Sequence, residues 1–267
     1  MGVEIRYYDL LPDKGWEANL DTVKSLIDRK TKAILVTNPS NPCSTVFSKE
    51  HQLEIIKIAE TYKVPLLCDE VYYGLVFPGQ EFHSFANLSS TVPMICLNSL
   101  SKVYMVPGWR LGWIIVYNRH GYFDKVKDHL AKYQRIPYHP CSLIMYALPK
   151  IFKETPKSFI DDYRSKLAVA SDYVFEGLSK IKGIQPIKAT ASMYMMVRIY
   201  FDQFKPDAGF TDDKVFVLRL WEEESVLILP SQCFYESGFV RIVTCISIES
   251  ADDFLKRFNS FISRYLI

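Results

Sequence analysis

Four short runs of apolar residues, separated by stretches with helical spacing, are the feature that most constrains the fold. They are Ala33–Val36, Val64–Cys68, Pro93–Leu97 and Leu111–Tyr117. Apolar runs of this length, bounded by turn residues, are typical of strands buried in a parallel sheet. Ser48 stands where it can cap a helix between the first two runs. Strands that alternate with helices predict βαβ units, and therefore an α/β domain with a mostly parallel sheet.

The pattern changes in the second half of the chain. A long helical pattern covers Pro156–Ile181, with apolar residues from Phe159 to Leu178 on one face. Three strands are expected after it, at Ile184–Ile187, Met193–Tyr200 and Phe239–Cys245. Two helices are expected among them, at Asp212–Glu224 and Ser250–Tyr265. This predicts a smaller α+β domain at the C-terminal end. We place the large domain at residues 1–168 and the small domain at residues 169–267.

Composition excludes several classes of protein. Of the 267 residues, 49% are hydrophobic, which is too many for a disordered chain. A net charge of +2 attracts neither nucleic acid nor an anionic membrane as a whole, and no apolar stretch is long enough to cross a bilayer. We therefore expect no nucleic-acid partner and no membrane association.

The six cysteines are Cys43, Cys68, Cys96, Cys141, Cys233 and Cys245, and none forms a C-x-x-C pair. This distribution predicts buried free thiols in a reducing compartment and no metal site. A cytoplasmic location is expected, and a mitochondrial one stays open.

Polar motifs follow the ends of the expected strands. In chain order they are Asn38–Pro42, Asp69–Tyr72, Ser99–Lys102 and Pro107–Gly112. Taken singly, they are typical of a turn, a helix cap, a surface loop and a second turn. Open α/β sheets bind ligands at the carboxyl ends of their strands, so the motifs together predict a binding site at that edge.

In this order and at these spacings, the motifs resemble those of the fold-type I aminotransferases that use pyridoxal 5′-phosphate (PLP). The segments Met1–Ile5, Ile34–Cys43, Val106–Ile114 and Phe239–Val243 look like the tyrosine aminotransferase branch of that family. The resemblance runs through the whole chain. It implies a PLP-transferase large domain with a mostly parallel sheet, followed by a smaller α+β domain.

The resemblance also implies catalytic roles. Lys102 matches the family's Schiff-base lysine, which also moves the substrate's α-proton. Asp69 matches the carboxylate that keeps the cofactor's pyridine nitrogen protonated, so that the ring can accept electrons. Asn41 and Tyr72 match the two groups that hydrogen-bond the ring oxygen O3′. Register from Asp69 favours Tyr72 over Tyr73, which is expected to pack.

Other residues match binding groups for the two anions. Ser99, Ser101 and Arg110 match the phosphate site, where two hydroxyls and a guanidinium suit a dianion. Arg241, with Asn41, matches the group that binds the substrate's α-carboxylate. Because Arg241 lies in an apolar strand, we expect its charge to be paired and partly buried.

The implied reaction is transamination of an aromatic amino acid. L-tyrosine and 2-oxoglutarate would give 4-hydroxyphenylpyruvate and glutamate by a ping-pong route, as in tyrosine and phenylalanine catabolism. The full-length family forms homodimers. Three alternatives stay open: an inactive aminotransferase fragment, an alanine or kynurenine aminotransferase, and a PLP-dependent β-lyase.

The sequence departs from the family pattern in three places. Ser44 and Ser192 stand where relatives usually have glycine, so a left-handed backbone there carries a conformational cost. Residues 3–8 alternate like a strand, and Met1 aligns with the interior of the family's large domain. We therefore expect an N-terminal portion to be absent, which would leave edge strands and an apolar sheet face exposed.

Overall fold

The computed structural model describes residues 2–133 and 140–267. The chain divides into two compact units. The large unit comprises Met1–Pro39, Thr45–Val76 and Gln80–Asp161, and the small unit comprises Ser40–Ser44, Phe77–Gly79 and Asp162–Ile267. The expected boundary at residue 168 falls inside helix α7 (Lys157–Leu178).

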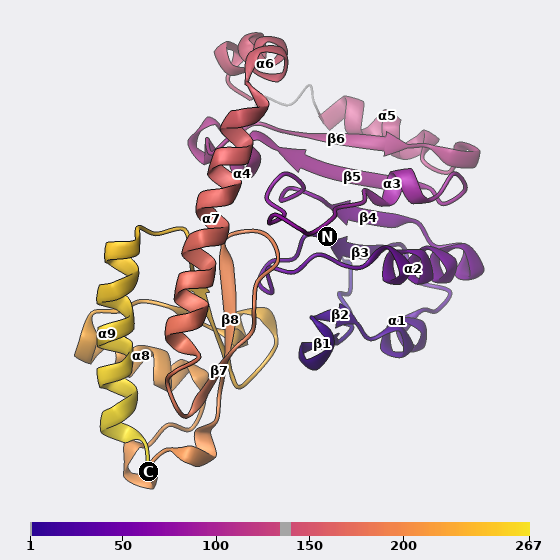
Figure 1. Ribbon diagram of the computed structural model, residues 1–267. Coiled ribbons are helices and arrows are strands. Elements are labelled where there is room, and N and C mark those ends of the chain that lie inside the picture. Colours follow the sequence, from indigo (N-terminus) through magenta and orange to yellow (C-terminus); the bar gives the residue numbers. More distant parts are fainter. Residues whose placement is uncertain (1, 134–139) are drawn as a thin grey trace. The chain divides into compact units, whose positions relative to one another are not determined.

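The large unit is built on a four-stranded sheet with the order β3-β4-β5-β6 (Figure 1). Its strands are β3 (Ile34–Thr37), β4 (Leu66–Asp69), β5 (Met94–Ser99) and β6 (Gly112–Tyr117). The first three strands pair in parallel and β6 is antiparallel to β5. All four expected strands are therefore confirmed, as is the mostly parallel sheet.

Helices and a small hairpin complete the large unit. They are β1 (Leu10–Leu11), β2 (Glu17–Ala18), α1 (Leu20–Leu26), α2 (Lys49–Tyr62), α3 (Phe85–Leu88), α4 (Leu100–Val103), α5 (Asp124–Tyr133) and α6 (Ser142–Glu154). Ser48 caps α2 as expected, since its hydroxyl accepts a hydrogen bond from the His51 backbone. The core of this unit lies between α2, α3 and one face of the sheet, where Val36, Leu66 and Met94 are buried.

The opposite face of this sheet is apolar and open. Leu35 of β3 is 53% exposed and Ile114 of β6 is 39% exposed. The strand register places both on one face, because paired residues point the same way and side chains alternate along a strand. The expected exposed apolar face is thus confirmed.

The expected strand at residues 3–8 is wrong, because the chain there has no strand and the first one is β1. Val3 and Ile5 are 72% and 69% exposed, so their alternation buries no face. The segment is held instead by single side chains, with the Tyr8 hydroxyl donating to the Leu35 carbonyl at 3.0 Å. Alternation predicts a strand only where a partner strand is available.

The expectation of buried cysteines holds only in part. The cysteines are free thiols, but only Cys43, Cys68 and Cys96 are buried, whereas the other three are exposed. Those three lie outside the apolar strand interiors, so the expectation of general burial was wrong for them. In residues 2–133 and 140–267, no helix is long and apolar enough to pass through a membrane.

The small unit is built on a second four-stranded sheet, antiparallel throughout, with the order β7-β8-β10-β9. Its strands are β7 (Ile184–Pro186), β8 (Tyr194–Ile199), β9 (Leu229–Pro230) and β10 (Phe239–Val243), and its further helices are α8 (Asp213–Glu224) and α9 (Ile248–Tyr265). The expected α+β character is confirmed, and β9 is an additional strand. The expected apolar face of α7 begins later than predicted, since Leu167 is buried while Phe159 is 45% exposed.

The core of the small unit is aromatic. Phe216 of α8 is fully buried, and its ring lies 5.2 Å from that of Phe210 and 5.3 Å from that of Phe261, in edge-to-face geometry. Such arrangements stabilise beyond simple area burial. They lock α8 and α9 onto one face of the antiparallel sheet.

Two short segments from the first third of the chain belong to the small unit. Ser44 is the anchor: its carbonyl accepts hydrogen bonds from the Thr190 and Ala191 backbones, and its hydroxyl accepts one from the Tyr194 backbone at 3.0 Å. Ser44 and Ser192 have φ of 54° and 66°. The expected left-handed serines are therefore confirmed, and the buried hydroxyl of Ser44 offsets part of their cost.

Replacing Phe216 with alanine should remove the centre of the small unit's aromatic core. The loss of buried area and the resulting cavity should cost about 3–5 kcal/mol, measured by urea unfolding of the small unit. Leu218→Ala on the same helix, where Leu218 is 44% exposed, is the control and should change stability little. Equal effects of the two substitutions would contradict this packing.

Candidate functional site

The strand register of the large unit brings several expected site residues to one edge of the sheet. Asp69 and Ser99 are the last residues of the parallel strands β4 and β5. Asn38, which follows β3, donates its backbone N–H to the Asp69 carbonyl at 3.0 Å. The carboxyl ends of the parallel strands therefore gather the polar motifs, as in other α/β sheets.

Asp69 carries an uncompensated carboxylate. Burial raises its pKa, and a hydrogen bond from the Val71 backbone at 3.3 Å lowers it by less. In the described part of the chain, no cationic side chain forms an ion pair with it. A half-buried carboxylate without a counter-cation costs stability. Its geometry suits a cationic group brought by a ligand.

Lys102 and Tyr72 lie close together in the large unit. Lys102 belongs to the short helix α4, directly after β5, and its Nζ is 5.6 Å from the centre of the Tyr72 ring. Tyr72 is buried, so its ring is held in place. The neighbouring Tyr73 ring lies 6.4 Å from the Phe82 ring, so Tyr73 packs as expected.

Ser99, Ser101 and Arg110 lie close to Lys102 along the chain. The Ser99 hydroxyl caps α4 by accepting from the Ser101 backbone at 3.2 Å. Arg110 donates to the Pro107 carbonyl at 2.9 Å and has a left-handed φ of 52°. Gly112 pairs with Ser99 in the sheet, and a Cβ there would lie 2.9 Å from a backbone oxygen. The glycine therefore permits the close pairing that holds Arg110 near the edge.

Asn41 and Arg241 come together in the small unit, although 200 positions separate them. Arg241 lies in β10, and its Nη1 donates to Oδ1 of Asn41 at 2.8 Å. The guanidinium is also 4.3 Å from the Tyr194 ring and 4.9 Å from the Phe234 ring. Its Nε is buried and has no hydrogen-bond partner.

Arg241 is half-buried, as expected, but it has no carboxylate partner among the described residues. Its charge is met by an amide oxygen and by two aromatic rings. Burial of an unpaired guanidinium is unfavourable, and each cation–π contact returns only about 0.5–2 kcal/mol. Such an arrangement suits an anion that a ligand brings.

The large unit contains a buried cluster that the sequence analysis did not identify, in and directly after strands β4 and β5. Cys68, Glu70 and Cys96 place their ligand-type atoms within 4.8 Å of one another. Glu70 already accepts hydrogen bonds from the Ser84 hydroxyl and the Phe85 backbone. Burial raises the pKa of Glu70, and the hydrogen bond that Cys68 shares with Cys96, together with burial, raises the pKa of Cys68. Its groups are satisfied internally, so we assign the cluster a structural role.

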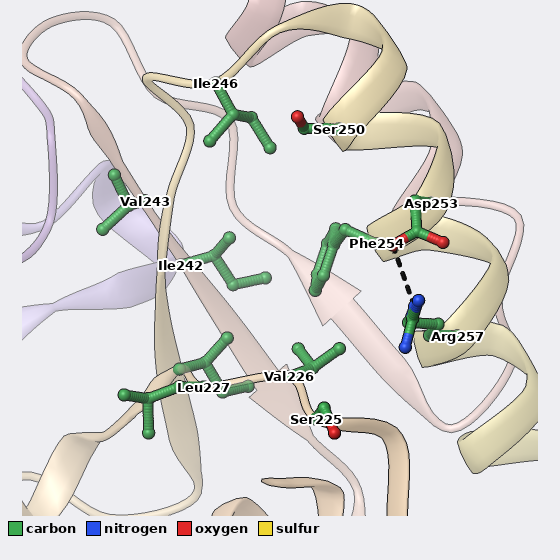
Figure 2. A pocket seen from close by; sticks show the side chains of 11 residues that line it. Ser225, Val226, Leu227, Ile242, Val243, Ile246, Ser250, Asp253, Phe254 and Arg257 are labelled. Atoms are coloured by element: carbon green, nitrogen blue, oxygen red, sulfur yellow. Dashed lines mark hydrogen bonds and ion pairs between the residues drawn. The ribbon is translucent and has the colours of Figure 1, made fainter.

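The small unit also contains an apolar cavity of about 480 Å³ (Figure 2). Ile242, Ile246 and Phe254 line it, and the ion pair between Asp253 and Arg257 lies at one side. None of the expected site residues lines it. The candidate functional site is therefore the set of motif residues and not this cavity.

These observations can be compared with known proteins. The profile of the family "aminotransferase class I and II" matches residues 1–258, and the chain belongs to this family. Tyrosine aminotransferase of Mus musculus is 41% identical over 250 residues, covering 92% of this chain and 54% of the mouse protein. The chain spans about half the length of the curated relatives it matches.

Solved structures agree with this assignment. Tyrosine aminotransferase from Leishmania infantum matches with a TM-score of 0.95 and 28% identity, over 100% of this chain and 65% of that one. Alanine aminotransferase from Pyrococcus furiosus matches with a TM-score of 0.89 and 30% identity, over 96% and 64%. The fold is therefore the fold-type I aminotransferase fold, as expected.

Membership of this family implies PLP as the cofactor, and the donor set of the large unit fits it. Asp69 lacks a counter-cation, which a protonated pyridine nitrogen would supply. Two serine hydroxyls and the guanidinium of Arg110 follow the sheet edge, and such groups suit a phosphate dianion. Lys102 supplies the amine that an aldehyde requires.

The Asp69 carboxylate should lower stability at neutral pH in the absence of cofactor. Its folded pKa is raised above the unfolded value of about 3.9, so the ionised form is the one that folding disfavours. Asp69→Asn should therefore raise the urea midpoint at pH 8, and the gain should shrink as pH falls through the raised pKa towards about 4.

Asp128→Asn on the exposed face of α5 is the matched control and should show no such pH-dependent gain. A loss of stability in Asp69→Asn at pH 8 that disappears near pH 4 would show instead that the carboxylate is paired in solution.

Proposed function

We propose that this chain carries the catalytic lysine and the substrate arginine of a PLP-dependent aminotransferase for aromatic amino acids. L-tyrosine is the proposed donor and 2-oxoglutarate the acceptor, with 4-hydroxyphenylpyruvate and glutamate as products. The observation that carries the proposal is the edge of the large sheet. There β4 ends at Asp69, a carboxylate with no ion-pair partner among the described residues, and β5 ends at Ser99, directly before the helix that carries Lys102. Family membership and the tyrosine aminotransferase relatives support it.

When bound, PLP supplies an aldehyde that accepts the amino group and a ring that withdraws electrons from the substrate's Cα. Asp69 holds a proton on the ring nitrogen. Ser99, Ser101 and Arg110 bind the phosphate and thereby orient the ring. Because Lys102 follows Ser101 directly, anchoring the phosphate also places the reactive amine.

Lys102 is the group that moves the proton. Its free Nζ would take the proton from the substrate's Cα. The Tyr72 ring lies 5.6 Å from Nζ, and its hydroxyl would donate to the cofactor's O3′, with Asn41 as the second proposed donor. Arg241 would bind the substrate's α-carboxylate and thereby restrict the orientation of Cα. In the whole enzyme we propose a homodimer in the cytoplasm.

A covalent attachment of cofactor to Lys102 has a direct optical test. Added PLP should give the visible absorbance band of lysine-bound cofactor in the native chain and no such band in Lys102→Ala. Lys127→Ala on the exposed face of α5 is the control and should keep the band. Arg110→Ala should weaken PLP binding roughly tenfold or more, since a charge-assisted contact contributes about 1.5–3 kcal/mol. No band at saturating PLP would refute the proposal for this polypeptide.

Substrate class is tested by the half-reaction. With PLP bound, tyrosine should convert the cofactor to its amine form, seen as a shift of the absorbance band, and 2-oxoglutarate should reverse the shift. Alanine should act far more slowly. One of the similar solved structures is an alanine aminotransferase, so alanine is the informative competing substrate. Conversion by alanine and not by tyrosine would overturn the aromatic assignment.

A further inference from the structure

The arginine of the small unit is held in an unusual way. Its guanidinium contacts the rings of Tyr194 and Phe234, at 4.3 Å and 4.9 Å, and Nη1 donates to Asn41. Tyr194 comes from β8 and Phe234 from the 3-10 helix Ser231–Phe234, so two separate elements that precede β10 in sequence supply the rings. Tyr194 is buried and Phe234 is half-buried.

An arginine in a strand can be stabilised by a carboxylate or by aromatic rings. The two kinds of partner differ in whether they occupy the N–H donors of the guanidinium. A carboxylate occupies the N–H donors at the edge of the guanidinium. A ring contacts the cation through its π face and uses none of those donors. Among residues 2–133 and 140–267, the one hydrogen bond of the guanidinium is that of Nη1 to Asn41, and the buried Nε has no partner.

We propose that Tyr194 and Phe234 are positioning residues that keep Arg241 ready for a substrate carboxylate. The inference rests on the proposed function, and it adds how the arginine is kept both stable and unoccupied. The rings offset the cost of burying the charge and restrict the rotamers of the long side chain. Less entropy is then lost when the carboxylate binds. An internal carboxylate would have stabilised the cation equally well but would have competed with substrate.

The consequence is specific. Removal of a ring should weaken the binding of every α-carboxylate ligand, amino donor and oxo-acid acceptor alike, because the effect acts through Arg241 and not through the side-chain pocket. Phe234→Leu should weaken carboxylate binding roughly 3- to 10-fold, as expected for loss of one cation–π contact. In turnover, KM should rise for both substrates while kcat changes little.

The test uses the full chain without cofactor and reads Arg241 directly. In protein labelled with ¹⁵N-arginine, the Nε–H resonance absent from Arg241→Lys identifies the residue. Ring currents should displace this resonance in the native chain, and titration with 3-phenylpropionate should move it. The neutral 3-phenylpropanol should not. In Phe234→Leu, the resonance should return towards ordinary arginine values and the dissociation constant should increase.

Matched variants separate positioning from general damage. Phe234→Tyr keeps a ring and should bind as the native chain does. Tyr235→Leu removes the adjacent aromatic side chain, which is 75% exposed, and should also leave binding unchanged. Native-like carboxylate binding by Phe234→Leu would overturn the inference. Because no cofactor is present, failure of PLP binding would refute the proposed activity without altering this result.

Discussion

The backbone ladder from β3 to β6 is the constraint on which the large unit depends. Parallel pairing of β4 with β5 aligns Asp69 with Leu97, so the two strands end within two residues of each other. The antiparallel return of β6 then brings Gly112 against Ser99. A shift of the register by one residue would turn Asp69 to the other face of the sheet. The position of the reactive groups is therefore a property of backbone hydrogen bonding more than of side-chain contacts.

Uncompensated charge is common to the candidate residues of the two units. Among the described residues, Asp69 in the large unit has a raised pKa and no ion-pair partner, and the buried Nε of Arg241 in the small unit has no hydrogen-bond partner. Each arrangement costs folding free energy that a simple apolar or ion-paired substitute would avoid. Residues that lower stability in this way are typical of binding sites, because the missing partner is supplied by a ligand.

Much of the fold could be predicted from periodicity, and the exceptions have physical causes. The buried strands and α2 with its Ser48 cap were predictable because burial imposes its pattern on consecutive residues. The alternation at residues 3–8 was misleading, because no neighbouring strand pairs with it. Strand β9 is only two residues long, too short to show a period. The candidate residues were identified by motif and not by geometry, since no local pattern reveals that Asn41 meets Arg241.

The sequence by itself determined the family, the order of the strands along the chain and the candidate site residues, since these are written in local motifs. Only the tertiary structure decided which groups contact the charged side chains. Ser44 ties the segment that carries Asn41 into the small unit, through backbone contacts with residues far along the chain. The rings of Tyr194 and Phe234 meet Arg241 only because β8, β10 and the intervening turn fold together. Such contacts depend on distance in space, which the spacing of residues along a chain does not contain.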